Sequence, residues 1–299
     1  MLNTNFGIEI ELTGITRSHA ADVITEITGG SKRYIGTYYD AYEVTVPDGR
    51  AWKVMLDGSI HTQKKEHGRL VPANKYYSCE VVSPILTYND DMEMLQNIVR
   101  ALRHNGAIAN SSTGIHIHLD GRGHNARTIK NWINLVASKN DLLYSALNIM
   151  PERRRWCKEM DAELVREINE RKPKTLDEIE DIWYEGYGDD RTYHYNSSRY
   201  HLCNLHSFFN GHHTIELRAF NSTTHAGEIR SYVALAIALN HHALTARSIS
   251  PKKPVTDNEK FTFRTFIVRI GLNGAEFANC REHLTKHLTG NSAWRYGRP

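Results

Sequence analysis

Short stretches in which apolar and polar residues alternate recur along the chain, and this period of two is typical of strands with one buried face. In residues 6–12 the sequence FGIEIEL places its isoleucines and leucine on one face, and Glu9 and Glu11 on the other. The expected strands are residues 5–13, 42–46, 51–56, 76–85, 113–119, 201–209 and 213–219. Asn210-Gly211 fits a hairpin turn between the last two, and short turns of this kind favour antiparallel pairing.

Segments with the 3.6-residue period of amphipathic helices separate and follow these strands. They are residues 17–28, 89–104, 126–149, 225–247, 257–271 and 274–288. The third segment should break near Asn140 and Asp141. Strands dominate early and late, with helices between them, and this order predicts an α+β fold built on a mainly antiparallel β-sheet with flanking helices.

The composition changes between Glu152 and Asp190, where two highly charged helical segments precede a loop rich in tyrosine and glycine. We interpret residues 151–198 as a charged helical insertion that ends in this Tyr-rich loop. Residues 225–288 are expected to be C-terminal helices of the same domain. No internal repeat divides the chain, so we expect one domain over residues 1–299.

The polar faces of the expected strands carry side chains that are unusual for a sheet surface. They are Glu9, Glu11, Glu80, His116, His118, Glu216 and Arg218. For one strand alone, a half-exposed antiparallel sheet explains the alternation without any function. However, Glu is depleted in strands, and two like unit charges about 4 Å apart repel by roughly 4 kcal/mol at an effective dielectric of 20. A bound cation is the simplest compensation.

Carboxylates with one or two imidazoles are typical of Mg²⁺ or Mn²⁺ sites, whereas closed zinc sites favour His and Cys. Mg²⁺ usually completes its coordination shell with water and phosphate oxygens, so a nucleoside triphosphate is a natural ligand. Arg218 lies two residues after Glu216 on the same strand face. It could therefore contact a transferred phosphate while Glu216 contacts the metal, as phosphoryl transfer requires.

Composition and charge limit the classes of partner that we expect the chain to bind. Lys and Arg together number 37 against 34 for Asp and Glu, and this balance of +3 does not indicate a nucleic-acid partner. The four cysteines show no CxxC spacing, which argues against a zinc knuckle or a disulfide framework. No apolar run approaches the roughly 18 residues of a membrane span, and the N-terminus lacks a signal-peptide pattern. We expect a cytoplasmic protein without a membrane partner, and the oligomeric state is not indicated.

Six motifs resemble, in the same order, those of the carboxylate-amine ligases of the glutamine synthetase and γ-glutamylcysteine ligase superfamily, most closely its amidoligase branch. They are FGIEIEL (6–12), DGSI (57–60), CEVVSPIL (79–86), STGIHIHLD (112–120), RYHLCNL (199–205) and TIELRAFNST (214–223). The resemblance implies a curved, mainly antiparallel sheet of the glutamine synthetase catalytic-domain type that holds ATP and Mg²⁺. It also implies that a small-molecule or peptide carboxylate is phosphorylated to an acyl phosphate, which an amine then attacks.

The resemblance also assigns roles to single residues. The positions that match metal ligands are Glu9, Glu11, Glu80, His116 and Glu216. Arg218 matches the arginine that contacts the phosphate and, with Glu216, the catalytic pair. His118 is expected to make a substrate or cofactor contact. Asp57, Arg199 and Asn204 match motif positions for which we expect substrate or nucleotide contact.

The same residues are also compatible with three other functions. A metal-dependent hydrolase could use the His-x-His strand, but that leaves Glu9, Glu11 and Arg218 without a role. A phosphotransferase of the guanidino-kinase kind could use the same sheet, and it would leave a stable phosphorylated product. A binding protein would show no metal-dependent ATP turnover. In the ligase, the Tyr-rich loop at residues 184–195 could close over the acyl phosphate and exclude water.

Overall fold

The computed structural model describes residues 1–188 and 190–296, and its chain divides into two compact units. The N-terminal unit contains residues 2–117 and 220–230, and the C-terminal unit contains Met1, residues 118–219 and residues 231–299. The division falls inside three elements, the strands β9 (Gly114–Asp120) and β11 (Thr214–Asn221) and the helix α6 (Ala226–Thr245). The strands form an open, mainly antiparallel sheet accompanied by helices, which confirms the predicted α+β class.

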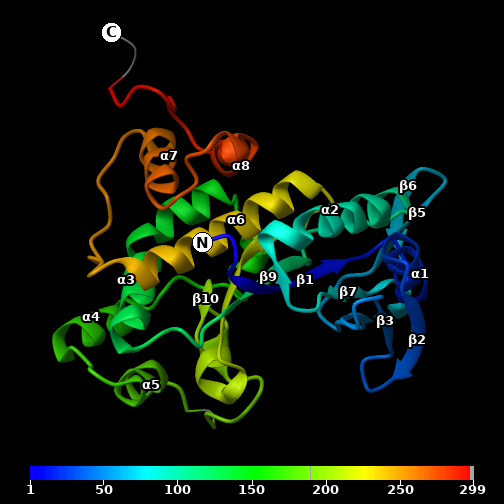
Figure 1. Ribbon diagram of the computed structural model, residues 1–299, viewed down its shortest axis with the longest axis horizontal. Coiled ribbons are helices and arrows are strands. Elements are labelled where there is room, and N and C mark those ends of the chain that lie inside the picture. The colour runs from blue at the N-terminus through cyan, green and yellow to red at the C-terminus, as the bar shows by residue number, and fades with distance from the viewer. Residues whose placement is uncertain (189, 297–299) are drawn as a thin grey trace. The chain divides into compact units, whose positions relative to one another are not determined.

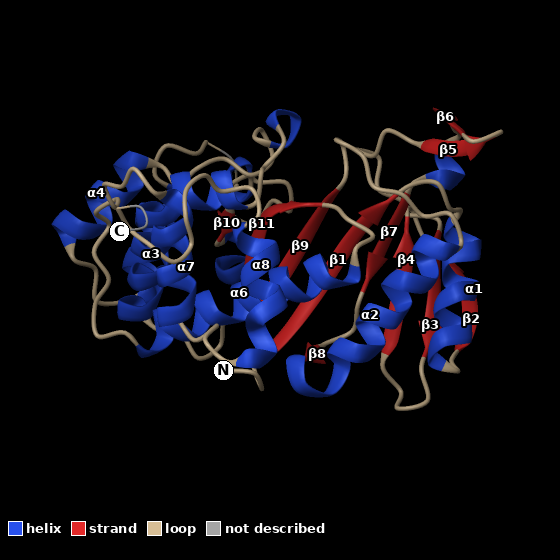
Figure 2. Ribbon diagram, turned by 90° about the horizontal axis from the view of Figure 1, so that it is seen from above, coloured by secondary structure: helices blue, strands red, loops and turns tan. Residues whose placement is uncertain are grey.

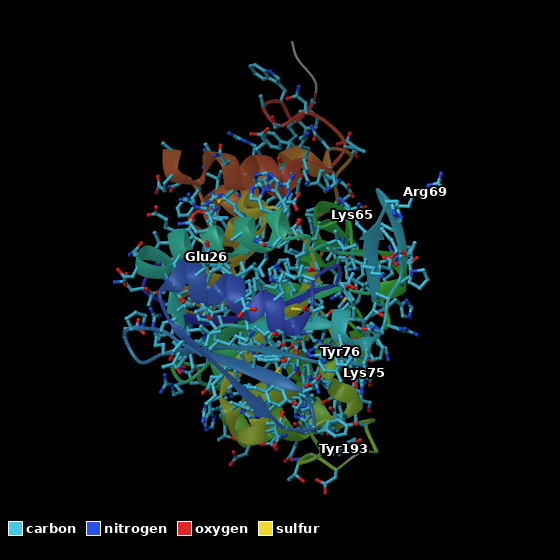
Figure 3. The ribbon with its side chains drawn as sticks, turned by 90° about the vertical axis from the view of Figure 1, so that its right-hand side faces the viewer. Glu26, Lys65, Arg69, Lys75, Tyr76 and Tyr193 are labelled. Atoms are coloured by element: carbon cyan, nitrogen blue, oxygen red, sulfur yellow. The ribbon has the colours of Figure 1, made fainter. Side chains whose placement is uncertain are left out.

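In the N-terminal unit the strands follow the order β9-β1-β7-β4-β3-β2, and β8 also pairs with β1. Their bounds are Asn5–Leu12 for β1, Ser31–Gly36 for β2, Ala41–Thr45 for β3, Ala51–Met55 for β4, Cys79–Val82 for β7 and Leu86–Thr87 for β8. The helices of this unit are α1 (Arg17–Thr28) and α2 (Tyr88–His104), with a 3-10 turn at Lys75–Tyr77. A separate two-stranded sheet joins β5 (Gln63–Glu66) and β6 (Arg69–Pro72), whose Lys65 and Arg69 are exposed (Figure 3).

Helices α1 and α2 lie along one face of this sheet (Figure 2). The apolar positions of the alternating strands, such as Ile10 on β1 and Val81 on β7, are fully buried on that face. The apolar stripe of α1, which includes Ala20 and Ile24, is equally buried. Because side chains alternate along a strand, the polar positions of β1 and β7 point to the opposite face. The hydrophobic pattern therefore fixes which face carries the carboxylates.

The C-terminal unit combines a short sheet with most of the helices. Strand β10 (Cys203–Asn204) pairs with β11 in antiparallel fashion, and β11 neighbours β9. The helices are α3 (Ala126–Ala146), α4 (Ala162–Arg171), α5 (Leu176–Tyr184), α6 (Ala226–Thr245), α7 (Glu259–Arg269) and α8 (Ala278–Thr285). None of the helices within residues 1–188 and 190–296 combines the length and apolar character needed to cross a membrane.

Helices α3 and α6 run side by side and are joined by buried polar contacts (Figure 1). Asn240 on α6 accepts hydrogen bonds from the indole N–H of Trp132 at 3.0 Å and from Nε2 of His124 at 2.8 Å. Asn131 donates to the carbonyl of Ala243 at 3.1 Å. These bonds satisfy polar groups that would be costly to bury without a partner.

Two sequence-based expectations about elements are wrong. Residues 201–209 do not form one strand, because the strand there spans Cys203–Asn204 and residues 208–212 form a kinked turn in which Asn210 and Gly211 leave the helical conformation. Asn210-Gly211 is therefore part of that turn and not a two-residue hairpin loop. Helix α3 also runs unbroken past Asn140 and Asp141. Asn140 is buried while Asp141 pairs at the surface with Lys253, so neither residue interrupts the helix.

A buried arginine links α1 to two other segments of the N-terminal unit through hydrogen bonds. Arg17 opens α1 and is only 2% exposed. Its Nη1 donates to the carbonyls of Lys75 and Ser78 at 2.7 Å each, and its Nε donates to the carbonyl of Asp40 at 3.0 Å. Nη2 pairs with the Asp40 carboxylate, which holds the pKa of that carboxyl below its ordinary value. A single planar fork thus fixes the start of α1 against the backbone that leads into β7.

Substitution of Arg17 by lysine should destabilise the fold by about 2–4 kcal/mol, because one ammonium group cannot replace a fork that serves four acceptors inside the protein. The matched control is Arg33→Lys on β2, since Arg33 is 73% exposed and pairs with Glu43 at the surface. This control should cost less than about 0.5 kcal/mol. Chemical denaturation followed by circular dichroism measures both, and equal losses in the two variants would contradict the assigned role.

Candidate active site

Two glutamates on β1 face a histidine on β9 within the N-terminal unit. His116 Nδ1 lies 2.9 Å from Oε2 of Glu9, and its Nε2 lies 3.7 Å from Oε1 of Glu11. The backbone N–H of Gly114 donates to Oε2 of Glu11 at 2.6 Å. Glu11 and His116 are buried, whereas the side chain of Glu9 is 26% exposed. One imidazole is therefore held between two carboxylates.

A third carboxylate joins them because of strand register. Glu80 on β7 is the direct partner of Glu11 on β1, and on its other side it is the partner of Met55 on β4. Like charges directly opposite each other destabilise an antiparallel pair. This arrangement is hard to explain by sheet stability, because an uncharged residue in place of Glu80 would fit the ladder better.

Asp57 enters the same region from the segment after β4. Its backbone N–H donates to Oγ of Ser78 at 3.1 Å, and that hydroxyl donates back to the Asp57 carbonyl at 2.6 Å. Ser78 is also the residue whose carbonyl accepts from Arg17. The buried arginine and the position of Asp57 are thus linked through one serine.

These side chains form two groups of three with the spacing of metal ligands. In one group, ligand atoms of Glu9, Glu80 and His116 all lie within 4.8 Å of one another. In the other group the same holds for Glu11, Asp57 and Glu80. Glu80 belongs to both groups, so its carboxylate could bridge two cations. Carboxylate oxygens with a single imidazole suit Mg²⁺ or Mn²⁺ better than zinc.

The nearest cysteine along the chain does not change this donor set. Cys79 precedes Glu80 on β7, is completely buried, and lies on the opposite, apolar face of the strand. Burial raises the pKa of its thiol to about 12, so it stays protonated near neutral pH. The donors of the two groups are therefore oxygen and nitrogen atoms.

In the C-terminal unit, Glu216 and Arg218 on β11 form a second buried polar group. Glu216 is 2% exposed and accepts a hydrogen bond at 2.6 Å from the side-chain amide of Asn204, its partner on β10. Its other oxygen pairs with Nη1 of Arg218. The carboxylate and the guanidinium are two residues apart, so they share one face of the strand, as the sequence predicts.

Arg153 contacts this group, although it lies in none of the six sequence motifs. It comes from the charged run Glu152–Arg155, yet it is only 2% exposed, and its Nη2 donates to the carbonyl of Arg218 at 3.2 Å. Nε of Arg218 itself donates to the carbonyl of Trp156 at 3.3 Å. Nothing in the sequence distinguishes Arg153 from its exposed neighbours, because its burial depends on tertiary packing.

One predicted site residue, Arg199, lies outside these groups. Arg199 stacks near the rings of Tyr195 and Tyr200, at 5.6 and 5.8 Å from their centroids, and donates to the carbonyl of His194. No contact of Arg199 with Glu216 or Arg218 occurs within the described residues. His118, in contrast, lies half-buried on β9 in the C-terminal unit, and one of its ring nitrogens lies within 4.8 Å of a carboxylate oxygen of Glu216.

Two tyrosines of the Tyr-rich loop form hydrogen bonds with histidines. Tyr187 contacts His201, which lies in the motif at residues 199–205, and Tyr184 contacts His206, which follows that motif. The hydroxyl of Tyr187 lies 2.6 Å from Nε2 of His201, whose Nδ1 lies 2.7 Å from the carbonyl of Glu159. Since a carbonyl only accepts, Nδ1 carries the proton and Tyr187 donates to Nε2. Tyr184 meets Nδ1 of His206 at 2.6 Å in the same way. Residue 189 of the expected lid lies outside the described residues.

Metal addition should raise the thermal stability of the protein, because a cation removes the repulsion among the clustered carboxylates. At Mn²⁺ or Mg²⁺ concentrations near 100 times Kd, linkage gives about 2.7 kcal/mol, or roughly 5–10 °C in Tm. Glu80→Gln should abolish most of this shift, since it removes the carboxylate that both groups share. Glu66→Gln on β5, whose side chain is 52% exposed, is the control and should keep the shift. Differential scanning fluorimetry with and without metal measures both variants.

Mild acid should weaken the C-terminal unit through its buried histidines. Burial lowers the pKa of His124 and of His201 below the ordinary value of 6.5, so both are neutral when folded. Below pH 6.5 the unfolded chain binds more protons, and stability therefore falls as pH drops from 6.5 through the lowered folded pKa. His201→Gln should show a smaller loss of Tm between pH 7.5 and 5 than the parent protein. The exposed His212→Gln should match the parent, and an unchanged pH profile in His201→Gln would contradict this account.

Comparison with known families gives one match. The model of a family described as "Putative amidoligase enzyme" matches residues 2–240, which is 239 of the 299 residues. The matched range includes every residue of the two polar groups and ends inside α6. No curated protein matches the chain.

Proposed function

The chain belongs to the amidoligase family, and from this premise we propose that it is an ATP- and Mg²⁺-dependent carboxylate-amine ligase. It would form an amide or peptide bond between a small-molecule or peptide acid and an amine. An acyl phosphate of the acid would be the intermediate, because a free carboxylate is a poor electrophile towards an amine.

One observation supports the metal dependence above all others. Two groups of three ligands share Glu80, and strand pairing places Glu80 directly against Glu11. A protein without a cation there would hold like charges at close range with no gain in stability. The donor set fits Mg²⁺ or Mn²⁺. We assign Glu9, Glu11, Glu80 and His116 as ligands, and Asp57 as a further ligand or substrate contact.

When bound, the metal ions would neutralise the triphosphate and orient its terminal phosphate for transfer. The chain's own residues have separate tasks. His116 is held between Glu9 and Glu11, which fixes the orientation of its ring. The Gly114 N–H donates to one oxygen of Glu11, which fixes the orientation of that carboxylate. The rigid ladder of β1, β7 and β9 would keep these donors in place without reorganisation.

Glu216 and Arg218 are proposed to act in the same reaction. The carboxylate is a further metal ligand, and the guanidinium offers a planar fork that suits phosphate oxygens. In the structure Arg218 is paired with Glu216, and the Asn204 amide holds the second oxygen of that carboxylate. Asn204 would therefore orient Glu216, and the carbonyl of Trp156 would orient Arg218. His118 and Arg199 remain proposed contacts to substrate or nucleotide.

We further propose that the antiparallel sheet is of the glutamine synthetase catalytic-domain type and that residues 1–299 act as one catalytic domain. The alternation of apolar and ligand-bearing positions on β1, β7 and β9 supports the first assignment. The family match across both compact units supports the second.

The decisive experiment offers ATP, Mg²⁺ and a pooled library of acids and amines, and identifies products by mass spectrometry. We expect ADP, phosphate and a new amide. Glu9→Gln, Glu216→Gln and Arg218→Lys should each lower the rate by about 100-fold or more, because each removes a group that contacts the metal or the transferred phosphate. Arg122→Lys, at a side chain 69% exposed, is the control and should keep the rate.

In each variant, circular dichroism and Tm show whether activity is lost because the site is changed or because the protein is unfolded. A stable phosphorylated acid without an amide would indicate a phosphotransferase. Bond cleavage without ATP would indicate a hydrolase. Parent-like turnover in Glu9→Gln or Arg218→Lys would overturn the assignment of the site.

A further inference from the structure

A basic pocket lies in the C-terminal unit between α3, α7, the end of α6 and the connection that follows it. Its volume is about 580 Å³, which is within the range of small-molecule sites. Most of its lining comes from residues 248–295, beyond residue 240, where the family match ends. The pocket is therefore a feature that membership of the family does not explain.

The sequence builds this pocket from two facing helices. On α7, Phe261, Thr265 and Arg269 recur every four residues, and Phe266 follows Thr265, so all four line the same side of the helix. On α3, Lys139 lies on the opposing wall, and its Nζ is 5.2 Å from the centroid of the Phe266 ring. The pocket thus has an aromatic wall beside a cation.

The charge of the lining has one sign. The ionisable side chains that line the pocket are Lys139, His242, Lys252, Arg269 and Arg295, and no acidic residue is among them. Lys139 donates to Oγ of Ser138, at 3.2 Å. None of the four Lys and Arg side chains makes an ion pair with any residue in the described part of the chain. By contrast Lys253, which is outside the lining, pairs with Asp141.

Like charges around one cavity repel each other, and an anion between them removes that repulsion. Lys139 is also half-buried, and burial lowers its pKa, which an anionic ligand would reverse. Arginine and lysine together suit phosphate oxygens, and hydroxyl groups such as Thr262 and Ser250 add neutral donors. The phenylalanine wall suits a flat, apolar body.

We propose that this pocket binds a small phosphorylated organic anion with an aromatic body, of the kind that a nucleoside diphosphate represents. The phosphates would lie among Lys139, Lys252 and Arg269, and the flat body against Phe266. This binding needs no metal and does not depend on the ligase reaction.

Isothermal titration of the full chain in EDTA tests the proposal, because chelation suppresses metal-dependent nucleotide binding elsewhere. The probes are uridine diphosphate, inorganic pyrophosphate, uridine and a single-stranded oligonucleotide. We expect one-to-one binding of uridine diphosphate that is tighter than binding of either part. Lys139→Met and Arg269→Ala should each raise its Kd at least 10-fold, and Phe266→Leu should weaken uridine diphosphate but not pyrophosphate.

Lys253→Ala and Glu80→Gln are controls and should leave the Kd unchanged, while Tm confirms that every variant is folded. Lack of saturable binding would overturn the proposal, as would equal affinity for pyrophosphate and uridine diphosphate. Unchanged affinity in both Lys139→Met and Arg269→Ala would do the same. Tighter binding of a single-stranded oligonucleotide, lost in the same variants, would also overturn it, because the ligand would then be a nucleic-acid strand.

Discussion

The constraint on which the N-terminal unit depends is the pairing of β1 with β7. That register buries the isoleucines and valines of the two strands against α1 and α2, and it also sets Glu11 against Glu80. A shift by one residue would move the apolar side chains out of the core and the carboxylates into it. The hydrophobic core therefore enforces an electrostatically unfavourable cluster, and its stability makes a cation site possible.

Residues that do not themselves offer metal ligands hold this cluster in place through hydrogen bonds. Arg17 fixes the backbone at Ser78, and Ser78 in turn holds the backbone of Asp57. In the C-terminal unit, Asn204 and the carbonyl of Trp156 play a similar part for Glu216 and Arg218. Apart from Asp57, the residues of both groups lie on strands, which hold side chains more precisely than loops do.

The alternating pattern was sufficient to predict the fold class and most of the elements. Strands such as β1 and β4, with one clearly apolar face, were found close to their observed bounds. The pattern does not reveal β2 and β5, because their sequences are largely polar, nor β6, which has only four residues in a separate hairpin. The sequence predicts a strand over residues 201–209 that a hairpin turn at Asn210-Gly211 joins to the next strand, but residues 208–212 form a turn instead.

Part of the candidate site follows from residue spacing within a strand, and part depends on the tertiary structure. Spacing within a strand was enough to place Glu9 with Glu11, and Glu216 with Arg218, on common faces. The proximity of Glu80 and Asp57 to Glu11 depends on register and on the Ser78 hydrogen bonds, neither of which the sequence displays. The burial of Arg153 and the basic pocket cannot be read from the sequence, because both arise from packing between distant helices and loops.

The hydrogen bond from the Gly114 amide to Glu11 has a dynamic consequence. It ties a carboxylate on one strand to the backbone of its neighbour, so any loosening at the start of β9 must also displace that side chain. Cation occupancy and local opening of the sheet are then thermodynamically linked. Protection of the Gly114 amide from solvent exchange becomes a direct reporter of how firmly the carboxylates are held.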